Sequence, residues 1–427
     1  MLLSFSATNY KSISDTQTLS LVGSKLKGPR EPLELLVPGG GNGVLPCAII
    51  YGANAAGKSN LVNAMSIMRR LVLDSHRDAA REASLPARPF LLDDDYEGEP
   101  TAFEVSFMVD SIRYDYGFSF DESQFLEEWL FSFPEGRRRK LFEREDGSIS
   151  FGSGMKGEKR SLERFLRENA LFLSIATQNK HEELSAVFSF FEDMFFSNRI
   201  SVGGHVIDAA FKENEIDERT IRFLEAIGTG VVGYQQTEAN RPDEIKAMLT
   251  DFRALIEKHA EPSDPSELPD VEEKEFKIEL GHLTKAGEKK FFAGSLESAG
   301  TRRLLVIMNR IFEVLDKGQV AIIDELDASL HSVAVKAMLA LFFDPTVNKN
   351  NAQLIATTHD TNLLDPEFLR RDEIWFVEKE VSGESQYFSL AEIVARKGEV
   401  FEKSYLAGRY GALPVMPDFS DLQMKSN

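Results

Sequence analysis

The sequence predicts an α/β fold: a split head with a phosphate-binding loop, an antiparallel β subdomain, and a mainly helical insertion that forms a lid or arm. Three observations predict it. A glycine-containing loop joins an apolar strand to an amphipathic helix within residues 47–73. Two later apolar segments, 320–325 and 354–360, end in charged or polar residues, which is typical of buried strands that carry functional groups at their ends. Residues 102–120 alternate between apolar and polar side chains, which is typical of antiparallel strands.

The loop in the first of these segments carries the most specific motif of the chain. Residues 52–59 match the pattern G-x-x-x-x-G-K-[ST], and the flanking strand and helix provide the setting that the motif requires. Its glycines allow backbone N–H groups to turn toward phosphate oxygens, and the helix N-terminus adds positive potential. Lys58 reaches the β- and γ-phosphates, and the Ser59 hydroxyl ligates Mg²⁺. We expect nucleotide contacts from Gly52, Ala53, Asn54, Ala55, Ala56, Gly57, Lys58, Ser59 and Asn60.

A second motif places two carboxylates at the end of an apolar strand. Residues 320–323 are all apolar, and Asp324 and Glu325 follow them directly. In this layout the strand carries Asp324 to the Mg²⁺ shell, while Glu325 points toward the γ-phosphate and orients or deprotonates water. Taken alone, two acids at a strand end are equally typical of a solvated turn. The apolar strand 354–358 ends at His359, which we expect to contact the γ-phosphate and sense its loss.

The third motif is Ser298-Ala299-Gly300, which opens an apolar helix that continues to Ile311. Ser298 and Gly300 at a helix N-terminus are suited to bind an anion. Serine and glycine are also common helix caps, so the segment alone is a weak signal. Its position between the loop and the two acids favours the interpretation as an anion site. The segment 327–331, with Asp327 and His331, follows the acids directly and completes the set.

The order of these motifs resembles that of an ABC-type ATPase head, as found in SMC proteins, RecF and the OLD nucleases. The opening segment 5–13 is similar to that branch. The tail 405–414 is similar to short prokaryotic AAA ATPases of anti-phage and abortive-infection operons, the RloA type. The resemblance covers roughly residues 1–70 and 290–415. In two respects the chain departs from it: Ala55 stands where RecF-like loops commonly have glycine, and no glutamine-loop residue is evident in the stretch 89–107, where one is expected.

The resemblance implies a slow ATPase that binds ATP and Mg²⁺. It assigns catalysis to Glu325 and His359, and metal binding to Ser59 and Asp324. It also implies a homo-oligomer of ATP-sandwiched heads, in which the Ser298-Ala299-Gly300 segment of one subunit closes over ATP held by the other.

The domain organisation follows from where the motifs lie. We expect the head to comprise residues 1–120 and 281–427, and the insertion to comprise 121–280. Within the insertion the sequence predicts a hairpin near 133–136, helices from Ser161, and a Phe-rich helix over 181–196. The remaining predictions are helices over 213–260, an acidic, Pro-rich linker over 261–270, and a hairpin of 276–282 with 289–293. A Phe-rich helix is more often core than surface, although an exposed part would serve a partner.

Composition limits the classes of function. A formal net charge of −20 argues against a protein whose whole surface grips DNA, although DNA binding remains possible. The run 137–140 is either a solvated loop or a local contact for nucleic acid or an acidic partner. The single cysteine excludes an intrachain disulfide framework. No apolar stretch approaches the roughly 20 residues of a membrane span, and no signal peptide is evident, so we expect a cytoplasmic protein.

Three functions fit these observations. The first is an ATPase that senses infection and controls a neighbour-encoded effector, a nuclease or a toxin. The second is a RecF-like DNA-binding repair ATPase. The third is a nucleotide-gated scaffold or toxin with little turnover. The sequence shows no motif typical of a nuclease centre, which favours a sensor or regulator without cutting chemistry of its own.

Overall fold

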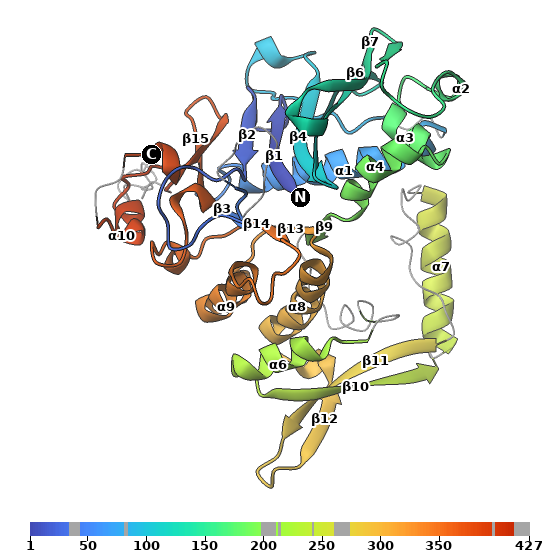
Figure 1. Cartoon of the computed structure of the whole chain (residues 1–427). Helices are drawn as coiled ribbons and strands as arrows, with labels where there is room; N and C mark the ends of the chain where they lie inside the picture. The colour runs from blue at the N-terminus through green and yellow to red at the C-terminus, as the bar shows by residue number, and fades with distance from the viewer. Residues whose placement is uncertain are drawn as a thin grey trace, which may run out of the picture. The chain divides into compact units, whose positions relative to one another are not determined.

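The computed structural model (Figure 1) divides into two compact units. The first unit comprises Met1–Phe196, Gly318–Leu326 and Phe342–Asn427, and the second comprises Ser197–Lys317 and Asp327–Leu341. The structure describes residues 1–33, 43–80, 84–197, 211, 215–240, 243–259, 274–394 and 398–413. Among these residues, no helix is long and apolar enough to cross a membrane.

The first unit contains an antiparallel sheet of seven strands in the order β2-β1-β4-β5-β6-β7-β8. The strands are β1 (Leu2–Thr8), β2 (Gln17–Ser20), β4 (Thr101–Val109), β5 (Ile112–Phe120), β6 (Phe125–Phe133), β7 (Arg139–Glu145) and β8 (Ser148–Phe151). The alternating segment 102–120 forms β4 and β5, which pair from Thr101 with Phe120 to Val109 with Ile112. The hairpin near 133–136 is the connection between β6 and β7. Both predictions are confirmed.

A second sheet of the first unit carries the motif strands. Its order is β16-β15-β3-β14-β13-β9. The strands are β3 (Cys47–Gly52), β9 (Phe195–Ser197), β13 (Val320–Ile323), β14 (Gln353–Thr357), β15 (Ile374–Lys379) and β16 (Ser385–Ser389). Strands β15, β3, β14 and β13 are mutually parallel, and β16 is antiparallel to β15. The predicted antiparallel subdomain is therefore present beside a sheet whose central strands are parallel, and the fold is mixed α/β.

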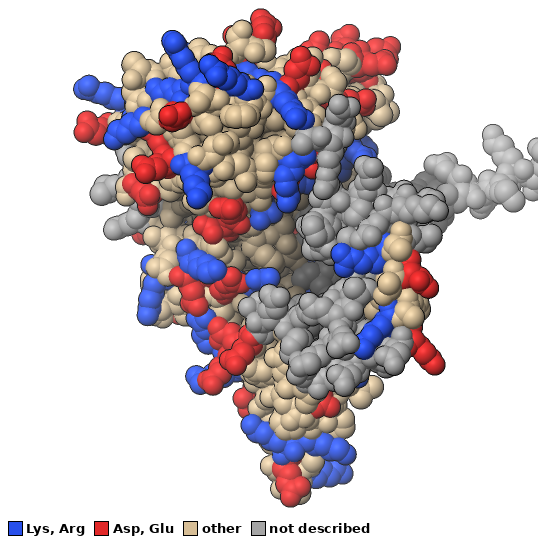
Figure 2. Space-filling model, turned by 90° about the vertical axis from the view of Figure 1, so that its right-hand side faces the viewer, with Lys and Arg blue, Asp and Glu red and all other residues tan. Residues whose placement is uncertain are grey.

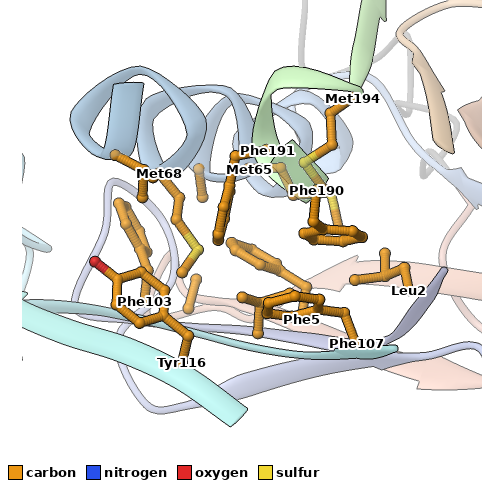
Figure 3. Close-up of a cluster of buried hydrophobic side chains, with 14 of the residues drawn as sticks. Leu2, Phe5, Met65, Met68, Phe103, Phe107, Tyr116, Phe190, Phe191 and Met194 are labelled. Carbon is orange, nitrogen blue, oxygen red and sulfur yellow. The ribbon is translucent and has the colours of Figure 1, made fainter. Parts of the chain in front are cut away.

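Helix α1 (Lys58–Ala80) follows the loop and packs on both sheets of the first unit. Its predicted apolar face is buried, with Leu61, Met65, Met68 and Val72 each at most 2% exposed. In Figure 3, Met65 and Met68 point down from the helix toward aromatic side chains of the antiparallel sheet. The same core cluster includes residues of β3, β13 and β15, so α1 connects the two sheets through one hydrophobic core.

The Phe-rich helix α4 (Glu182–Glu192) belongs to this core. Phe188, Phe190 and Phe191 are at most 6% exposed, and the ring of Phe190 stacks on Phe107 with centroids 4.1 Å apart. The packing confirms the prediction of a core helix and leaves these rings no surface for a partner. The helix ends earlier than predicted, because the segment 195–197 forms strand β9 at the edge of the second sheet. Two short helices precede α4, namely α2 (Arg160–Glu163) and α3 (Phe172–Gln178).

The second unit combines four helices and a three-stranded antiparallel sheet in the described residues. Its elements are α6 (Glu218–Ala226), β10 (Val231–Asn240), α7 (Asp243–His259), β11 (Lys274–Leu283), β12 (Lys289–Ala293), α8 (Ala299–Lys317) and α9 (Ser332–Phe343), whose last two residues belong to the first unit. Arg219 of α6 donates to Asp316 and lies over the ring of Phe312, both on α8. The first unit ends with the short helix α10 (Phe401–Leu406).

The prediction of helices over 213–260 is confirmed for α6 and α7 and wrong for 231–240, which forms strand β10. Gly228 and Gly230 both adopt positive φ, of +82° and +81°, and end α6. The following residues then pair with β11 from Val231 to Asn240. The hairpin of β11 and β12 is as predicted. The predicted linker 261–270 lies outside the described residues.

The two compact units do not coincide with the predicted head and insertion. Residues 121–196, placed in the insertion by the sequence, share the core of the first unit. Residues 281–317, placed in the head, belong to the second unit. The division into a head and an insertion at residues 120 and 281 therefore stays a prediction, which rests on the resemblance to the family.

Candidate functional site

Three neighbouring parallel strands deliver the predicted catalytic groups to one edge of the second sheet. Strand β14 lies between β3 and β13. The phosphate loop follows β3, Asp324 follows β13, and His359 follows β14. Because the carboxyl ends of parallel strands meet at the same edge, motifs far apart in the sequence become neighbours. This edge is the usual ligand site of parallel α/β sheets.

The backbone of the loop explains its glycines. Gly57 has a φ of +116°, and a Cβ there would lie 2.2 Å from Ser385 Oγ. A Cβ on Gly52 would lie 2.5 Å from the carbonyl oxygen of Val377. Ala55 adopts a φ of +63°, where an L-residue costs roughly 1–2 kcal/mol. The position at which RecF-like loops commonly have glycine is therefore a strained left-handed position in this chain as well.

Lys58 lies inside this loop. It is 7% exposed, and its Nζ donates hydrogen bonds to the carbonyl oxygens of Gly52 at 2.7 Å and Ala53 at 3.1 Å. Lys58 is also the first residue of α1, so its ammonium group belongs to the N-terminal end of the helix, where the helix dipole is positive. This arrangement gives the loop a concentrated positive potential, as phosphate binding requires.

A chain of hydrogen bonds joins the three strand ends. Ser59 Oγ donates to Asp324 Oδ1 at 3.1 Å, and Thr357 Oγ1 donates to the same oxygen at 2.6 Å. The backbone N–H of Glu325 in turn donates to Thr357 Oγ1 at 2.7 Å. Glu325 has a φ of +52°, a strained conformation that is common at functional sites. The single hydroxyl of Thr357 thus positions both acids, a role that the sequence did not indicate.

The oxygen atoms of Ser59 and Asp324 fit a magnesium ion. Mg²⁺ prefers oxygen ligands at 2.0–2.1 Å in octahedral geometry, so two adjacent ligands lie about 3 Å apart. The 3.1 Å between Ser59 Oγ and Asp324 Oδ1 agrees with this spacing. Few protein ligands are typical of Mg²⁺ bound to a nucleotide, since waters and phosphates supply the rest. Accordingly, the described residues contain no cluster of three or more His, Cys, Asp or Glu that could hold a metal without a nucleotide.

The loop is also supported from the side by β16 and the turn after β1. Ser385 Oγ donates to the carbonyl of Ala56 at 2.5 Å, and Tyr387 Oη donates to that of Gly57 at 2.7 Å. Burial raises the pKa of Tyr387, so its phenol remains a donor. Asn60 Nδ2 donates to Ser12 Oγ at 2.6 Å. These supports come from residues far away in the sequence, and of them only Ser12 belongs to a segment that the sequence analysis singled out.

The Ser-x-Gly segment belongs to the second unit, apart from the other candidate residues. Ser298 caps α8, since its Oγ accepts the backbone N–H of Thr301 at 3.0 Å. Gly300 lies against the segment after the acids, where a Cβ would be 2.5 Å from the carbonyl of Ser329. Both residues line a pocket of about 230 Å³ that His331 also borders. The cap interpretation is therefore correct for Ser298, and its trans role toward ATP stays a prediction.

The other candidates are placed as follows. His359 and Asn54 are exposed, and Ala53 is half-buried. The stretch 89–107 contains no glutamine, and it is held instead by Asn9, whose side chain bonds the backbone of Phe90, Tyr96 and Glu99. In the basic run 137–140, Arg138 lies over the ring of Phe131, while Arg139 pairs with Glu183 and Lys140 with Glu143. Because these side chains make contacts within the chain, they favour a structural role for the run over a contact with nucleic acid or an acidic partner.

Comparison with known proteins identifies the family. A family profile described as "AAA domain, putative AbiEii toxin, Type IV TA system" matches residues 47–365, and the chain belongs to this family. No curated protein matches the chain. Among solved structures, it is similar to an SMC head bound to the C-winged-helix domain of ScpA, at 14% identity and a TM-score of 0.37, covering 91% of this chain and 97% of that chain.

A second similar structure is the recombination mediator RecF with ATP, at 14% identity and a TM-score of 0.38, covering 91% of this chain and 99% of that chain. The match of the family profile thus shows that this chain is a member of the AAA family described above. The narrower resemblance to the RloA type stays a prediction.

Proposed function

We propose that this AAA-family chain binds and slowly hydrolyses ATP with Mg²⁺, and that it regulates a separate effector in anti-phage defence. The observation that carries the ATPase proposal is the hydrogen-bond chain from Ser59 through Asp324 and Thr357 to the backbone of Glu325. It connects the phosphate loop, the metal-binding acid and the general base at one sheet edge. An ordinary solvated turn would not need a buried threonine to orient both acids.

Each residue then has a defined task. Lys58 exchanges its bonds to the loop carbonyls for the β- and γ-phosphate oxygens. Ser59 and Asp324 would hold Mg²⁺, which neutralises charge on the phosphates. Glu325 orients or deprotonates the attacking water, and His359 contacts the γ-phosphate. Catalysis of phosphoryl transfer is mainly positioning and electrostatic stabilisation, which a preorganised edge of this kind supplies.

Two variants test the ATPase proposal. Lys58→Ala should abolish ATP binding, measured by calorimetry with ATP and Mg²⁺. Glu325→Gln should retain ATP affinity and lose at least about a hundredfold in turnover, because the base is removed while the phosphate contacts remain. Wild-type affinity in the Lys58 variant would refute the site assignment. Unchanged turnover in the Glu325 variant would refute only the role of Glu325.

The regulatory part of the proposal is supported by the family description, which names a toxin of a type IV toxin–antitoxin system. We expect the effector to be a nuclease or toxin encoded beside this chain and held or released according to the bound nucleotide. A differential affinity of roughly 3 kcal/mol shifts a two-state population about a hundredfold, which is sufficient for control. Because Phe188, Phe190 and Phe191 are core residues, the docking surface must use other side chains.

Co-purification from the native operon tests the regulatory part. The neighbour-encoded protein should bind the full-length chain preferentially in either ATP or ADP. If no neighbour co-purifies in either state, effector control fails while the ATPase assignment stands. Hydrolysis stimulated by DNA at physiological salt would then favour the RecF-like alternative. Tight ATP binding with no measurable turnover would favour a nucleotide-gated scaffold or toxin.

A further inference from the structure

A pocket of about 360 Å³ lies at the end of α1 opposite to the phosphate loop. Its volume falls within the roughly 300–1,000 Å³ of small-molecule sites. His76 and Ala79 of α1 border it, and His76 is about 27 Å along the helix from Lys58, at roughly 1.5 Å per residue. The pocket therefore belongs to the first unit but not to the nucleotide site described above.

The apolar floor of this pocket and the ring of Phe165, which forms its wall, suit a flat ring as ligand. The floor is the small apolar cluster of Ala79, Ala170 and Ile175, each at most 6% exposed. Phe165 borders the pocket with 62% of its surface exposed, whereas the other phenylalanines of the segment 160–191 lie in the core. An exposed aromatic ring beside an apolar floor is the arrangement on which bases of nucleic acids stack.

The rim of the pocket is basic. Arg164 is exposed and has no ion pair among the described residues. Arg167 donates one N–H, from Nη1, to the carbonyl of Ala79 at 2.8 Å, which directs its guanidinium to the pocket edge. The acidic residues of the same segment, Glu163 and Glu168, do not border the pocket. Figure 2 shows Lys and Arg side chains interspersed with Asp and Glu on the upper part of this face.

Amide and imidazole groups complete the pocket. Gln178 and Asn179 of the α3 end border it and can pair with the edge of a base. His76 Nδ1 lies 3.0 Å from Ser174 Oγ, and burial lowers the pKa of His76, so the ring is neutral at pH 7. With Nδ1 engaged by Ser174, the Nε2 of the neutral imidazole remains for one hydrogen bond, which suits contact with a base better than ion pairing.

The pocket is held by a rigid frame. The N-terminus of α3 has no cap from its own N-cap residue, Leu171. Instead, the fully buried carboxylate of Glu128 accepts the backbone N–H groups of Phe172 at 2.6 Å and Leu173 at 3.1 Å. Arg144 fixes the preceding loop through the carbonyl of Ala170 at 2.7 Å. The wall and floor are therefore preorganised, which lowers the entropic cost of binding.

From these features we infer that this pocket binds a nucleobase that carries a phosphate, with the base against Phe165 and the phosphate on Arg164 and Arg167. Two sources supply this chemistry: a free nucleotide, and an unpaired base of a single-stranded nucleic acid. A site at the far end of α1 gives the chain a second place where a nucleotide or a strand binds. The helix that connects it to the phosphate loop is a direct structural link between the two sites.

The test uses two probes on the full-length chain. The first probe is the set of nucleoside monophosphates, titrated by calorimetry. These lack the β- and γ-phosphates that Lys58 is proposed to hold, so the result does not depend on the proposed ATPase function. The second probe is a fluorescein-labelled 12-nucleotide single strand, as DNA and as RNA, followed by anisotropy at several salt concentrations. Tighter binding of the strand identifies nucleic acid as the source, and binding of monophosphates alone identifies a free nucleotide.

Matched variants decide whether the pocket is responsible. Phe165→Ala should weaken binding by about fivefold to a hundredfold, the range expected for loss of one stacked base. Arg164→Ala should weaken it several-fold and reduce the salt slope for the strand by about 0.7. Arg160→Ala removes an exposed arginine of the neighbouring helix α2 that does not border the pocket, and Phe292→Ala removes an exposed ring of the second unit. Both controls should bind as wild type.

The inference is overturned if wild type binds neither probe. It is also overturned if Phe165→Ala and Arg164→Ala bind like the two controls, because the probe would then occupy another surface. All four altered side chains are exposed to solvent, so folding should be unaffected, and matching thermal midpoints verify this. A loss of affinity in the pocket variants alone supports the inference.

Discussion

Two hydroxyl groups position the acidic residues of the candidate site. Asp324 accepts from two hydroxyls, those of Ser59 and Thr357, and only Thr357 also contacts the backbone of Glu325. Hydrogen bonds to charged groups contribute roughly 1.5–3 kcal/mol each, so the loss of one moves the acids from their working positions. Catalysis depends on such positions to within about half an ångström.

Thr357→Val should therefore reduce ATP turnover by at least about tenfold while ATP affinity falls less. The substitution removes the hydroxyl that orients both acids but leaves the phosphate loop intact. Thr357→Ser keeps the hydroxyl and should retain most of the turnover. The measurement is steady-state hydrolysis together with calorimetric ATP affinity. Equal turnover in the valine and serine variants would contradict the positioning role.

Glu373 is a second residue with an unusual environment. Its carboxylate is fully buried, it pairs with Arg30, and burial raises its pKa to about 7. A carboxyl whose folded-state pKa lies above its unfolded value of 4.5 stabilises the fold below pH 4.5, and this stabilisation is lost as the pH rises through 7.

Stability should consequently decrease by up to about 3 kcal/mol between pH 5 and pH 8 through this group. Glu373→Gln, which cannot ionise, should remove this part of the pH dependence. Denaturant unfolding at the two pH values measures it. The exposed residue Glu367 serves as a control, since Glu367→Gln should leave the profile unchanged. A Glu373→Gln protein with the wild-type pH slope would show that the carboxyl is already ionised at pH 5.

At the scale of elements, neighbouring strands decide where helices begin and end. Helix α3 starts at a residue without a capping side chain, because β6 supplies the cap through Glu128. Strand β10 replaces a predicted helix because β11 offers a long pairing edge. In both cases the deciding partner lies far away in the sequence, where local propensity carries no information.

Glu128→Ala should destabilise the first unit by about 2–4 kcal/mol. It leaves two buried backbone N–H groups and the hydroxyl of Tyr116, 3.0 Å from Glu128 Oε1, without their acceptor. The neighbouring Glu127 is exposed, and Glu127→Ala should cost less than about 0.5 kcal/mol. Chemical denaturation compares the two. A small effect of Glu128→Ala would mean that water replaces the carboxylate at the helix start.

At the scale of the molecule, the candidate residues are divided between two compact units. The phosphate loop and the two acids belong to the first unit, whereas Ser298 and Gly300 belong to the second. The resemblance to ABC-type heads predicts that the second group acts on ATP held by another subunit. Such a site is complete only in a pair, so ATP would serve as part of the interface, and Glu325→Gln should accumulate ATP-bound pairs or larger rings.

Mixing two inactive variants tests this arrangement. Lys58→Ala removes the phosphate contact, and Ser298→Arg blocks the exposed serine. Each protein alone should be inactive, but a mixed pair has one site built from an intact loop and an intact Ser-x-Gly segment. Hydrolysis should therefore return in the mixture, with ATP-dependent association seen by sedimentation. If mixing restores no activity although the proteins associate, the site is formed within one subunit, and the head-to-tail model fails.

Much of the candidate site could be predicted from the sequence because its motifs are local. The loop 52–59, the acids Asp324 and Glu325, and the apolar face of α1 follow from spacing and periodicity, which the chain fixes over a few residues. The alternating strands β4 and β5 are predictable for the same reason, since alternation reports one buried face.

Only the tertiary structure decided which distant residues complete the site. Thr357 contacts the acids because parallel strands place their ends side by side, and Ser385 and Tyr387 contact the loop from β16, which pairs antiparallel with β15. The pocket beside Phe165 likewise forms from the C-terminal part of α1, α3 and the segment between α2 and α3, and the residues that border it belong to no motif. The sequence by itself determined the local phosphate-binding chemistry, because that chemistry depends on neighbouring residues. Strand pairing and core packing decided the rest, because they depend on contacts that no local pattern records.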